Sequence, residues 1–276
     1  MTTIPRLTQP RKWRSLVLAS ASVTLAVAGA PTFASLIPAP VTLARAPDAR
    51  LWLAQAQGGE GGESGIVATA TDPAAAYLAE LTMLEGHMVA ARDLYAEGNA
   101  RDAINLTGHP AAEGMLATIQ TALAARGQPD IAPALAAFSA TMQNAASQPD
   151  VDAALSSLSA AIASAQATEA HHTRYRFDAV VLVLKAASEE YTSSITGDKV
   201  TDIMAYHEAS SYIALSRSAL AALAADPLAA KAVPRALDAL KAADDAFGDM
   251  ANPQARDPAI LAAVAARVEL IASSVR

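Results

Sequence analysis

The chain of 276 residues contains no cysteine. This absence excludes disulfides, thiolate metal sites, iron–sulfur clusters, covalently attached c-type haem, a lipoprotein anchor and a cysteine nucleophile. Aromatic residues make up only 4% of the chain, although 53% of its residues are hydrophobic. Most of this excess is alanine, the best helix former, and runs of Val, Ile and Thr bounded by turn residues are almost absent. The composition therefore predicts an all-α fold.

Sequence signatures of enzymes are missing as well. The chain has no His-Glu-x-x-His zinc protease motif, no Gly-x-Ser-x-Gly elbow, no phosphate-binding loop and no dinucleotide fingerprint. We therefore expect a protein that is not an enzyme. A hydrolase acting on the cell envelope is a weaker alternative, and it would need a cleft that holds a nucleophile and a base.

Charge limits the partners that the chain can bind. The formal net charge is −7, and the first 34 residues carry four basic side chains and no acidic one, so the remainder is more acidic still. Such a surface repels nucleic acid and anionic lipid. We therefore expect a metal ion or an envelope protein as partner, and no nucleic acid.

The N-terminus has the layout of a signal peptide. Basic residues at 11, 12 and 14 precede an apolar stretch over 15–30, which is short for a membrane span, and small residues follow it. We expect a signal peptide over 1–34, export to the periplasm and no stable membrane span after cleavage. An uncleaved anchor is the alternative. The glycine–glutamate run within 57–65 predicts a disordered linker over 35–70.

Turn and capping residues divide the rest of the chain into helices. Asp72-Pro73 is a helix start, with Asp as N-cap and Pro at the first helical position, and Gly98 is a helix stop. Similar signals predict helices at 102–107, 110–126, 133–146, 150–169, 174–195, 202–225, 227–247 and 258–275. Short connections favour antiparallel neighbours. We expect an up-and-down antiparallel helical bundle, with an N-terminal helical subdomain over 71–147 and a C-terminal bundle over 148–276.

A first group of candidate metal ligands lies in the predicted N-terminal subdomain. Met83 and His87 are four residues apart and share a helix face, and His109 and Glu113 have the same spacing. Imidazole and carboxylate suit iron, zinc or copper, and a thioether would favour copper. The structural alternative is that His109 only caps its helix and that His87, beside Gly86, fills a tight helix crossing.

A second group flanks a predicted turn in the C-terminal bundle. Glu189 and Glu190 come near the end of one helix, and His207 and Glu208 lie on the next. Carboxylates and imidazole at a helix junction suit ferric iron or a divalent ion. In the structural alternative, Asp202 caps the second helix and the nearby tyrosines pack against each other.

This region carries a resemblance to a known family. The residues are Glu-Glu-Tyr at 189–191, Gly-Asp-Lys-Val at 197–200 and Tyr-His-Glu-Ala at 206–209. About residues 174–220 resemble the periplasmic helical segment that precedes the membrane domain of bacterial high-affinity iron permeases. The chain departs from the family pattern at position 207. It also lacks the permease's membrane helices and its Arg-Glu-x-x-Glu motif. The resemblance therefore implies a periplasmic relative that handles iron or another metal without transporting it.

The leading prediction is thus a periplasmic helical-bundle protein that binds iron or copper in envelope metal uptake or homeostasis. Its candidate ligands are His87, His109, Glu113, Glu189, Glu190, His207 and Glu208. The alternative is a non-catalytic structural or protein-interaction module of the envelope, which would show an exposed apolar groove in place of converging ligands.

Overall fold

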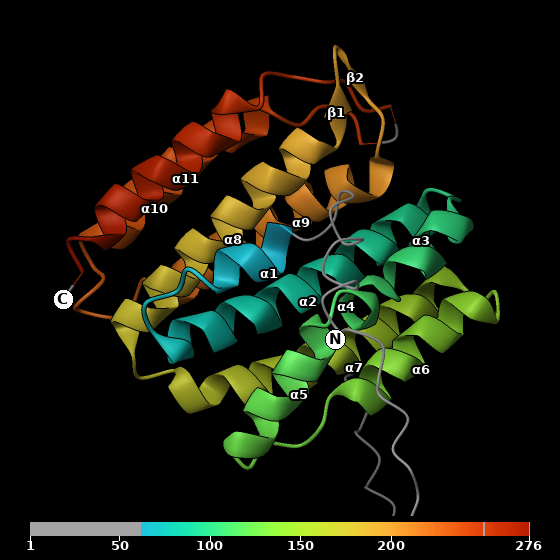
Figure 1. Ribbon diagram of the computed structural model, residues 1–276, viewed down its shortest axis with the longest axis horizontal. Coiled ribbons are helices and arrows are strands. Elements are labelled where there is room, and N and C mark those ends of the chain that lie inside the picture. Colours follow the sequence, from blue (N-terminus) through green and yellow to red (C-terminus); the bar gives the residue numbers. More distant parts are fainter. Residues whose placement is uncertain (1–61, 251, 276) are drawn as a thin grey trace, which may run out of the picture. The chain divides into compact units, whose positions relative to one another are not determined.

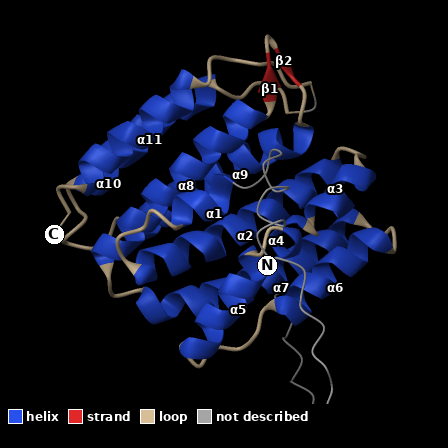
Figure 2. Cartoon of the chain, viewed as in Figure 1, coloured by secondary structure: helices blue, strands red, loops and turns tan. Residues whose placement is uncertain are grey.

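The computed structural model describes residues 62–250 and 252–275. The predicted signal peptide and most of the predicted linker lie outside these residues. Within them the all-α prediction is confirmed, since helices account for nearly all of the regular structure (Figures 1 and 2). No helix of this part of the chain is long and apolar enough to cross a membrane.

The first half of the described chain forms α1 (Gly62–Val67), α2 (Pro73–Ala96), α3 (Ala100–Leu106), α4 (His109–Ala112), α5 (Met115–Ala125), α6 (Ala132–Gln143) and α7 (Gln148–Gln166). The second half forms the 3-10 turn η1 (Ala167–Glu169), α8 (Thr173–Ser193), β1 (Ile195–Thr196), β2 (Lys199–Val200), α9 (Ile203–Ala222), α10 (Ala232–Leu240), η2 (Lys241–Asp245) and α11 (Ala259–Ala272).

Two helices begin where their capping residues predict. The Asp72 carboxylate accepts a hydrogen bond from Ala74 N–H at 2.8 Å and starts α2. The Asp202 carboxylate accepts from the backbone N–H groups of Met204 and Ala205 at 3.0 and 3.2 Å and starts α9. In both cases the aspartate satisfies backbone donors that the first helical turn leaves without a partner.

Three local features differ from the predicted elements. The helix expected between His109 and Gly127 is divided into α4 and α5, because Gly114 takes a left-handed conformation with φ +82°. Residues 195–200 form a two-stranded antiparallel hairpin where no sheet was expected, with Gly197 at φ +65° in its turn. The end of the predicted linker is helical, as α1, whose residues Ile66 and Val67 are buried.

The core of the bundle forms around α2, α8 and α9. The hairpin pairs α8 with α9, and α2 packs against both of them as well as against α3 and α7 (Figure 1). The described residues belong to one compact unit, and the subdomain boundary expected near residue 148 stays a prediction. This arrangement places one face of α2 against one face of α9.

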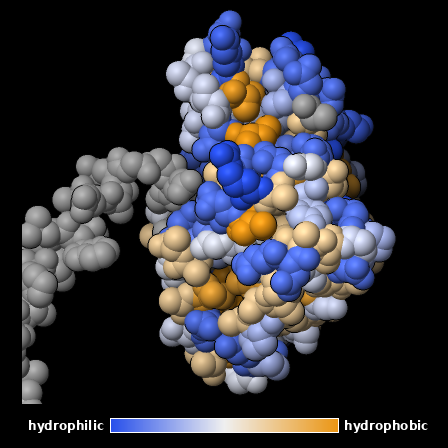
Figure 3. All heavy atoms as spheres, turned by 90° about the vertical axis from the view of Figure 1, so that its right-hand side faces the viewer, coloured by the Kyte–Doolittle hydropathy of each residue, from blue (hydrophilic) through white to orange (hydrophobic). Residues whose placement is uncertain are grey.

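Few large apolar side chains of the described residues are exposed at the surface. The face in Figure 3 is mixed, with apolar residues in small areas separated by hydrophilic ones. The exposed large hydrophobic side chains of the described residues are Leu228, at 64% exposure, and Leu270, at 73%. Leu228 follows α9 and Leu270 lies on α11.

Candidate metal centre

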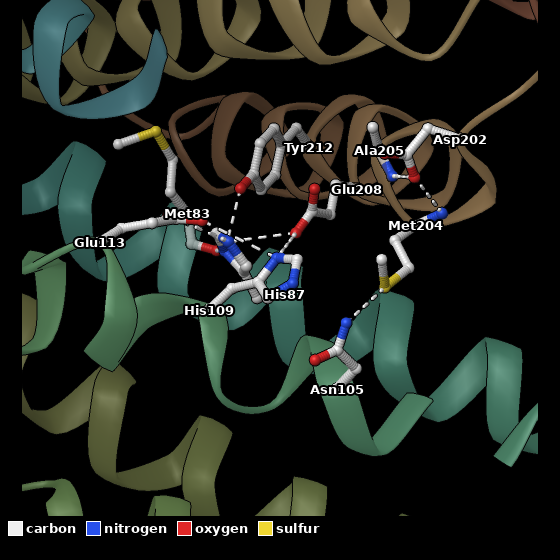
Figure 4. A network of polar contacts seen from close by, with 10 residues as sticks. All are labelled: Met83, His87, Asn105, His109, Glu113, Asp202, Met204, Ala205, Glu208 and Tyr212. Atoms are coloured by element: carbon white, nitrogen blue, oxygen red, sulfur yellow. Dashed lines mark hydrogen bonds and ion pairs between the residues drawn. The ribbon is translucent and has the colours of Figure 1, made fainter. Parts of the chain in front are cut away.

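Three buried side chains from three helices converge on one point. His87 comes from α2, His109 begins α4 and Glu208 comes from α9 (Figure 4). One ligand atom from each residue lies within 4.8 Å of the other two. In the part of the chain that the structure describes, no other group of three or more histidine or acidic side chains is placed to hold a metal ion.

The distances within this group approach those of a coordination sphere. Glu208 Oε1 lies 3.1 Å from His87 Nε2 and 3.8 Å from His109 Nδ1. Metal–ligand bonds of about 2.0–2.2 Å imply ligand–ligand distances of about 3.0 Å in an octahedron and about 3.4 Å in a tetrahedron. The two distances from Glu208 are therefore close to these values, and the third pair of ligand atoms lies within 4.8 Å.

The two ring nitrogens of His87 face different partners. His87 Nδ1 lies 2.9 Å from the backbone carbonyl oxygen of Met83, one turn earlier on α2. A carbonyl oxygen can only accept, so the tautomer that satisfies it carries its hydrogen on Nδ1. Nε2 is then the nitrogen that presents a lone pair to Glu208 Oε1. A backbone carbonyl that orients the far nitrogen of a histidine in this way is typical of metal sites.

Glu208 Oε1 is the most informative atom of the group. It is buried and has no hydrogen-bond partner within the described part of the chain. His87 Nε2 lies 3.1 Å away and carries no hydrogen in the tautomer that donates to Met83. Two acceptors therefore face each other at hydrogen-bond distance, and a cation between them, either a proton or a metal ion, is required to offset their repulsion.

A glycine in the middle of α2 allows the two helices to meet here. A Cβ atom at Gly86 would lie 2.3 Å from Cδ1 and Cε1 of the Tyr212 ring, so only glycine accommodates this ring. Tyr212 lies on α9, four residues after Glu208 and therefore on the same helix face. Its hydroxyl lies 3.0 Å from His87 Nδ1. The close approach at Gly86 thus places His87 against Glu208.

Glu113 adds a second carboxylate beside the group. Its Oε2 lies 3.9 Å from His87 Nε2, its Oε1 lies 3.8 Å from His109 Nδ1, and its side chain is 14% exposed. It is not part of the convergent group of three. Ionised Glu113 and Glu208 together would balance the charge of a divalent ion, which matters because an unbalanced charge is costly to bury.

The remaining predicted ligands lie elsewhere. Glu189 is exposed, and Glu190 is buried on α8 outside the convergent group. His207 points away from Glu208, since neighbouring residues on a helix are about 100° apart. His207 Nε2 lies 3.4 Å from Glu97 Oε2. Burial lowers the pKa of His207 to about 4, so this imidazole is neutral at pH 7.

Around the hairpin, the structure agrees with the alternative to a metal site, in which Asp202 caps a helix and the tyrosines pack together. Asp202 caps α9, and the rings of Tyr191 and Tyr206 pack with centroids 5.7 Å apart. Phe247 completes this aromatic cluster by contacting both tyrosine rings edge-on. The Tyr191 hydroxyl donates to the carbonyl oxygen of Ala246 at 2.7 Å. These tyrosines are therefore packing residues that hold the C-terminal segment on the bundle.

Comparisons with models of protein families, with curated proteins and with solved structures find no match for this chain.

Proposed function

We propose that the protein binds one divalent transition-metal ion through His87 Nε2, His109 Nδ1 and the Glu208 carboxylate, with Glu113 as a neighbouring carboxylate. The observation that carries this proposal is the buried Glu208 Oε1, which has no hydrogen-bond partner among the described residues and lies 3.1 Å from His87 Nε2. A metal ion would bind both atoms at once.

The donor set limits which metal fits. Two imidazoles and a carboxylate suit zinc(II) or iron(II). Met83 takes part through its backbone carbonyl, and its thioether points away from the imidazoles (Figure 4). Without a sulfur ligand the site has no chemical preference for copper(I). Between the other two ions, the resemblance to the iron-permease segment favours iron.

We assign this binding to metal uptake or homeostasis in the periplasm, without catalysis, as the sequence predicts. The export prediction rests on residues 1–34 alone. The alternative of an interaction module has less support, because the exposed large hydrophobic residues of the described chain are Leu228, in the loop after α9, and Leu270, on α11.

Competitive titration tests the proposal. The metal-free chain is titrated with Fe(II) in the absence of oxygen, and separately with Zn(II), against a chromophoric chelator. We expect one ion per chain, with affinity reduced at least a hundredfold in His87→Ala and in Glu208→Gln. His171→Ala is the matched control, because His171 is exposed and lies far along the chain from the ligands. Equal affinity in all four proteins would refute the assigned ligands.

A further inference from the structure

A separate cavity lies between α2, α7, α8 and α9. Its volume is about 310 Å³, and it opens to solvent. Most of its wall is aliphatic, including Leu78, Ala179, Val180, Val183 and Ala219. None of the metal-site residues lines it. Ligand pockets in proteins span about 300–1,000 Å³, so this cavity suits a small apolar molecule.

One charged side chain, Arg176, is among the residues that line the cavity. Arg176 has no ion pair within 4 Å among the described residues, and it donates a long hydrogen bond of 3.4 Å to the carbonyl oxygen of Ala170. Arginine keeps its charge at all ordinary pH values and binds carboxylates through paired N–H groups. The cavity therefore offers an anion site beside an apolar wall.

Ser216 supplies a second polar group. It is 1% exposed, and its hydroxyl has no hydrogen-bond partner within the described residues. A serine inside a helix ordinarily donates to the carbonyl four residues earlier, as Ser218 does to Ala214. Two other polar side chains of the wall have partners, since Gln166 donates to Thr82 Oγ1 at 3.1 Å and Thr82 donates to the carbonyl oxygen of Leu78 at 2.8 Å. The Ser216 hydroxyl is thus available to a ligand oxygen.

We propose that this cavity binds a small amphiphilic monoanion, a medium-chain aliphatic carboxylate. Its carboxylate oxygens are held by Arg176 and the Ser216 hydroxyl, and its chain lies along Leu78, Val180 and Val183. The single arginine favours a monoanion, and the aliphatic wall favours an unbranched chain over a sugar or a peptide. This site does not depend on the metal centre.

Calorimetric titration of the full chain with octanoate, in the presence of EDTA, tests the proposal. We expect one octanoate per chain and at least tenfold weaker binding of octan-1-ol and octylamine. Arg176→Gln should weaken octanoate binding at least tenfold, and Ser216→Ala several-fold. Ala219→Leu should abolish binding, because it fills the cavity.

Two matched controls accompany these variants. Ser218→Ala changes an exposed serine on the same helix, and Arg101→Gln changes an exposed arginine outside the cavity. Neither should alter octanoate binding. Ser216→Ala removes only an unmatched buried hydroxyl, so it should melt no lower than the parent and remain informative if Arg176→Gln fails to fold.

Three results would overturn the proposal. The first is no octanoate binding to the parent protein. The second is octan-1-ol binding as tightly as octanoate. The third is octanoate binding that survives Ser216→Ala and Ala219→Leu unchanged but is lost in His87→Ala, which would place the carboxylate at the metal centre instead.

Discussion

Replacing Gly86 by alanine should separate α2 from α9 and disturb the metal centre. The new Cβ would lie 2.3 Å from two atoms of the Tyr212 ring, whereas carbon atoms in contact are about 3.5–4.0 Å apart. The ring must therefore retreat by more than an ångström. This movement would also break the contact between the Tyr212 hydroxyl and His87 Nδ1, which are 3.0 Å apart.

Opposing effects set the size of the change. Alanine is favoured over glycine within a helix by about 0.8–1.0 kcal/mol. Overpacking a core costs about 1–3 kcal/mol, and losing a hydrogen bond costs about 0.5–1.5 kcal/mol. We therefore expect Gly86→Ala to lower the free energy of unfolding by about 2 kcal/mol. For a chain of this size that is a fall in Tm of about 4–8 °C.

A double-mutant cycle, followed by denaturant unfolding, tests this reasoning. In a Tyr212→Leu background the ring is gone, so Gly86→Ala should stabilise the protein by up to about 1 kcal/mol through helix propensity alone. In the parent, displacing a residue that supports a ligand should weaken metal binding about 10–100-fold. If Gly86→Ala stabilises the parent as much as it stabilises Tyr212→Leu, the close approach of α2 and α9 at this position is wrong.

Three further predictions concern separate parts of the molecule. Glu208→Gln should leave the free energy of unfolding of the metal-free protein within about 1 kcal/mol of the parent, as measured with urea, because the glutamine amide can donate to the lone pair of His87 Nε2. A loss of about 3 kcal/mol would instead indicate a structural ion pair. Burial raises the pKa of Glu80 from 4.5 to about 7, so the folded state holds the carboxyl proton more tightly than the unfolded state does. The resulting stabilisation is about 1–2 kcal/mol after allowance for solvent screening. It is present in full below pH 4.5 and is lost as the pH rises through 7. Unfolding measured from pH 5 to 8 should show this loss in the parent and a smaller one in Glu80→Gln; identical profiles would contradict the raised pKa. Gly114→Ala should lower the free energy of unfolding by about 1–2 kcal/mol, because residue 114 has a φ of +82°, where a Cβ atom is strained. A Tm equal to that of the parent would count against the break between α4 and α5.

Local signals made most of the helices predictable. Asp72-Pro73 and Asp202 mark helix starts because a short acidic side chain accepts hydrogen bonds from backbone groups a few residues away. The division at Gly114 was not predicted, since a glycine inside an apolar pattern is compatible with either a continuous helix or a break. The hairpin at 195–200 was missed because its strands are only two residues long.

The candidate site was predictable in part, for a physical reason. Helical spacing groups residues of one element, so His87 was considered with Met83, and His109 with Glu113. Spacing does not show which helix faces which, and Glu208 was therefore grouped with its neighbour His207 and with the acidic end of α8. Gly86 did indicate a tight helix crossing beside His87, but the sequence did not show that Tyr212 on α9 is the side chain that packs there.

The most direct test of the central claim is a crystal structure of the Fe(II)- or Zn(II)-loaded protein with diffraction data on both sides of the metal absorption edge. We expect one strong anomalous peak within about 2.0–2.3 Å of His87 Nε2, His109 Nδ1 and a Glu208 oxygen. A peak bound to other residues, or a loaded crystal with no peak between α2, α4 and α9, would contradict it.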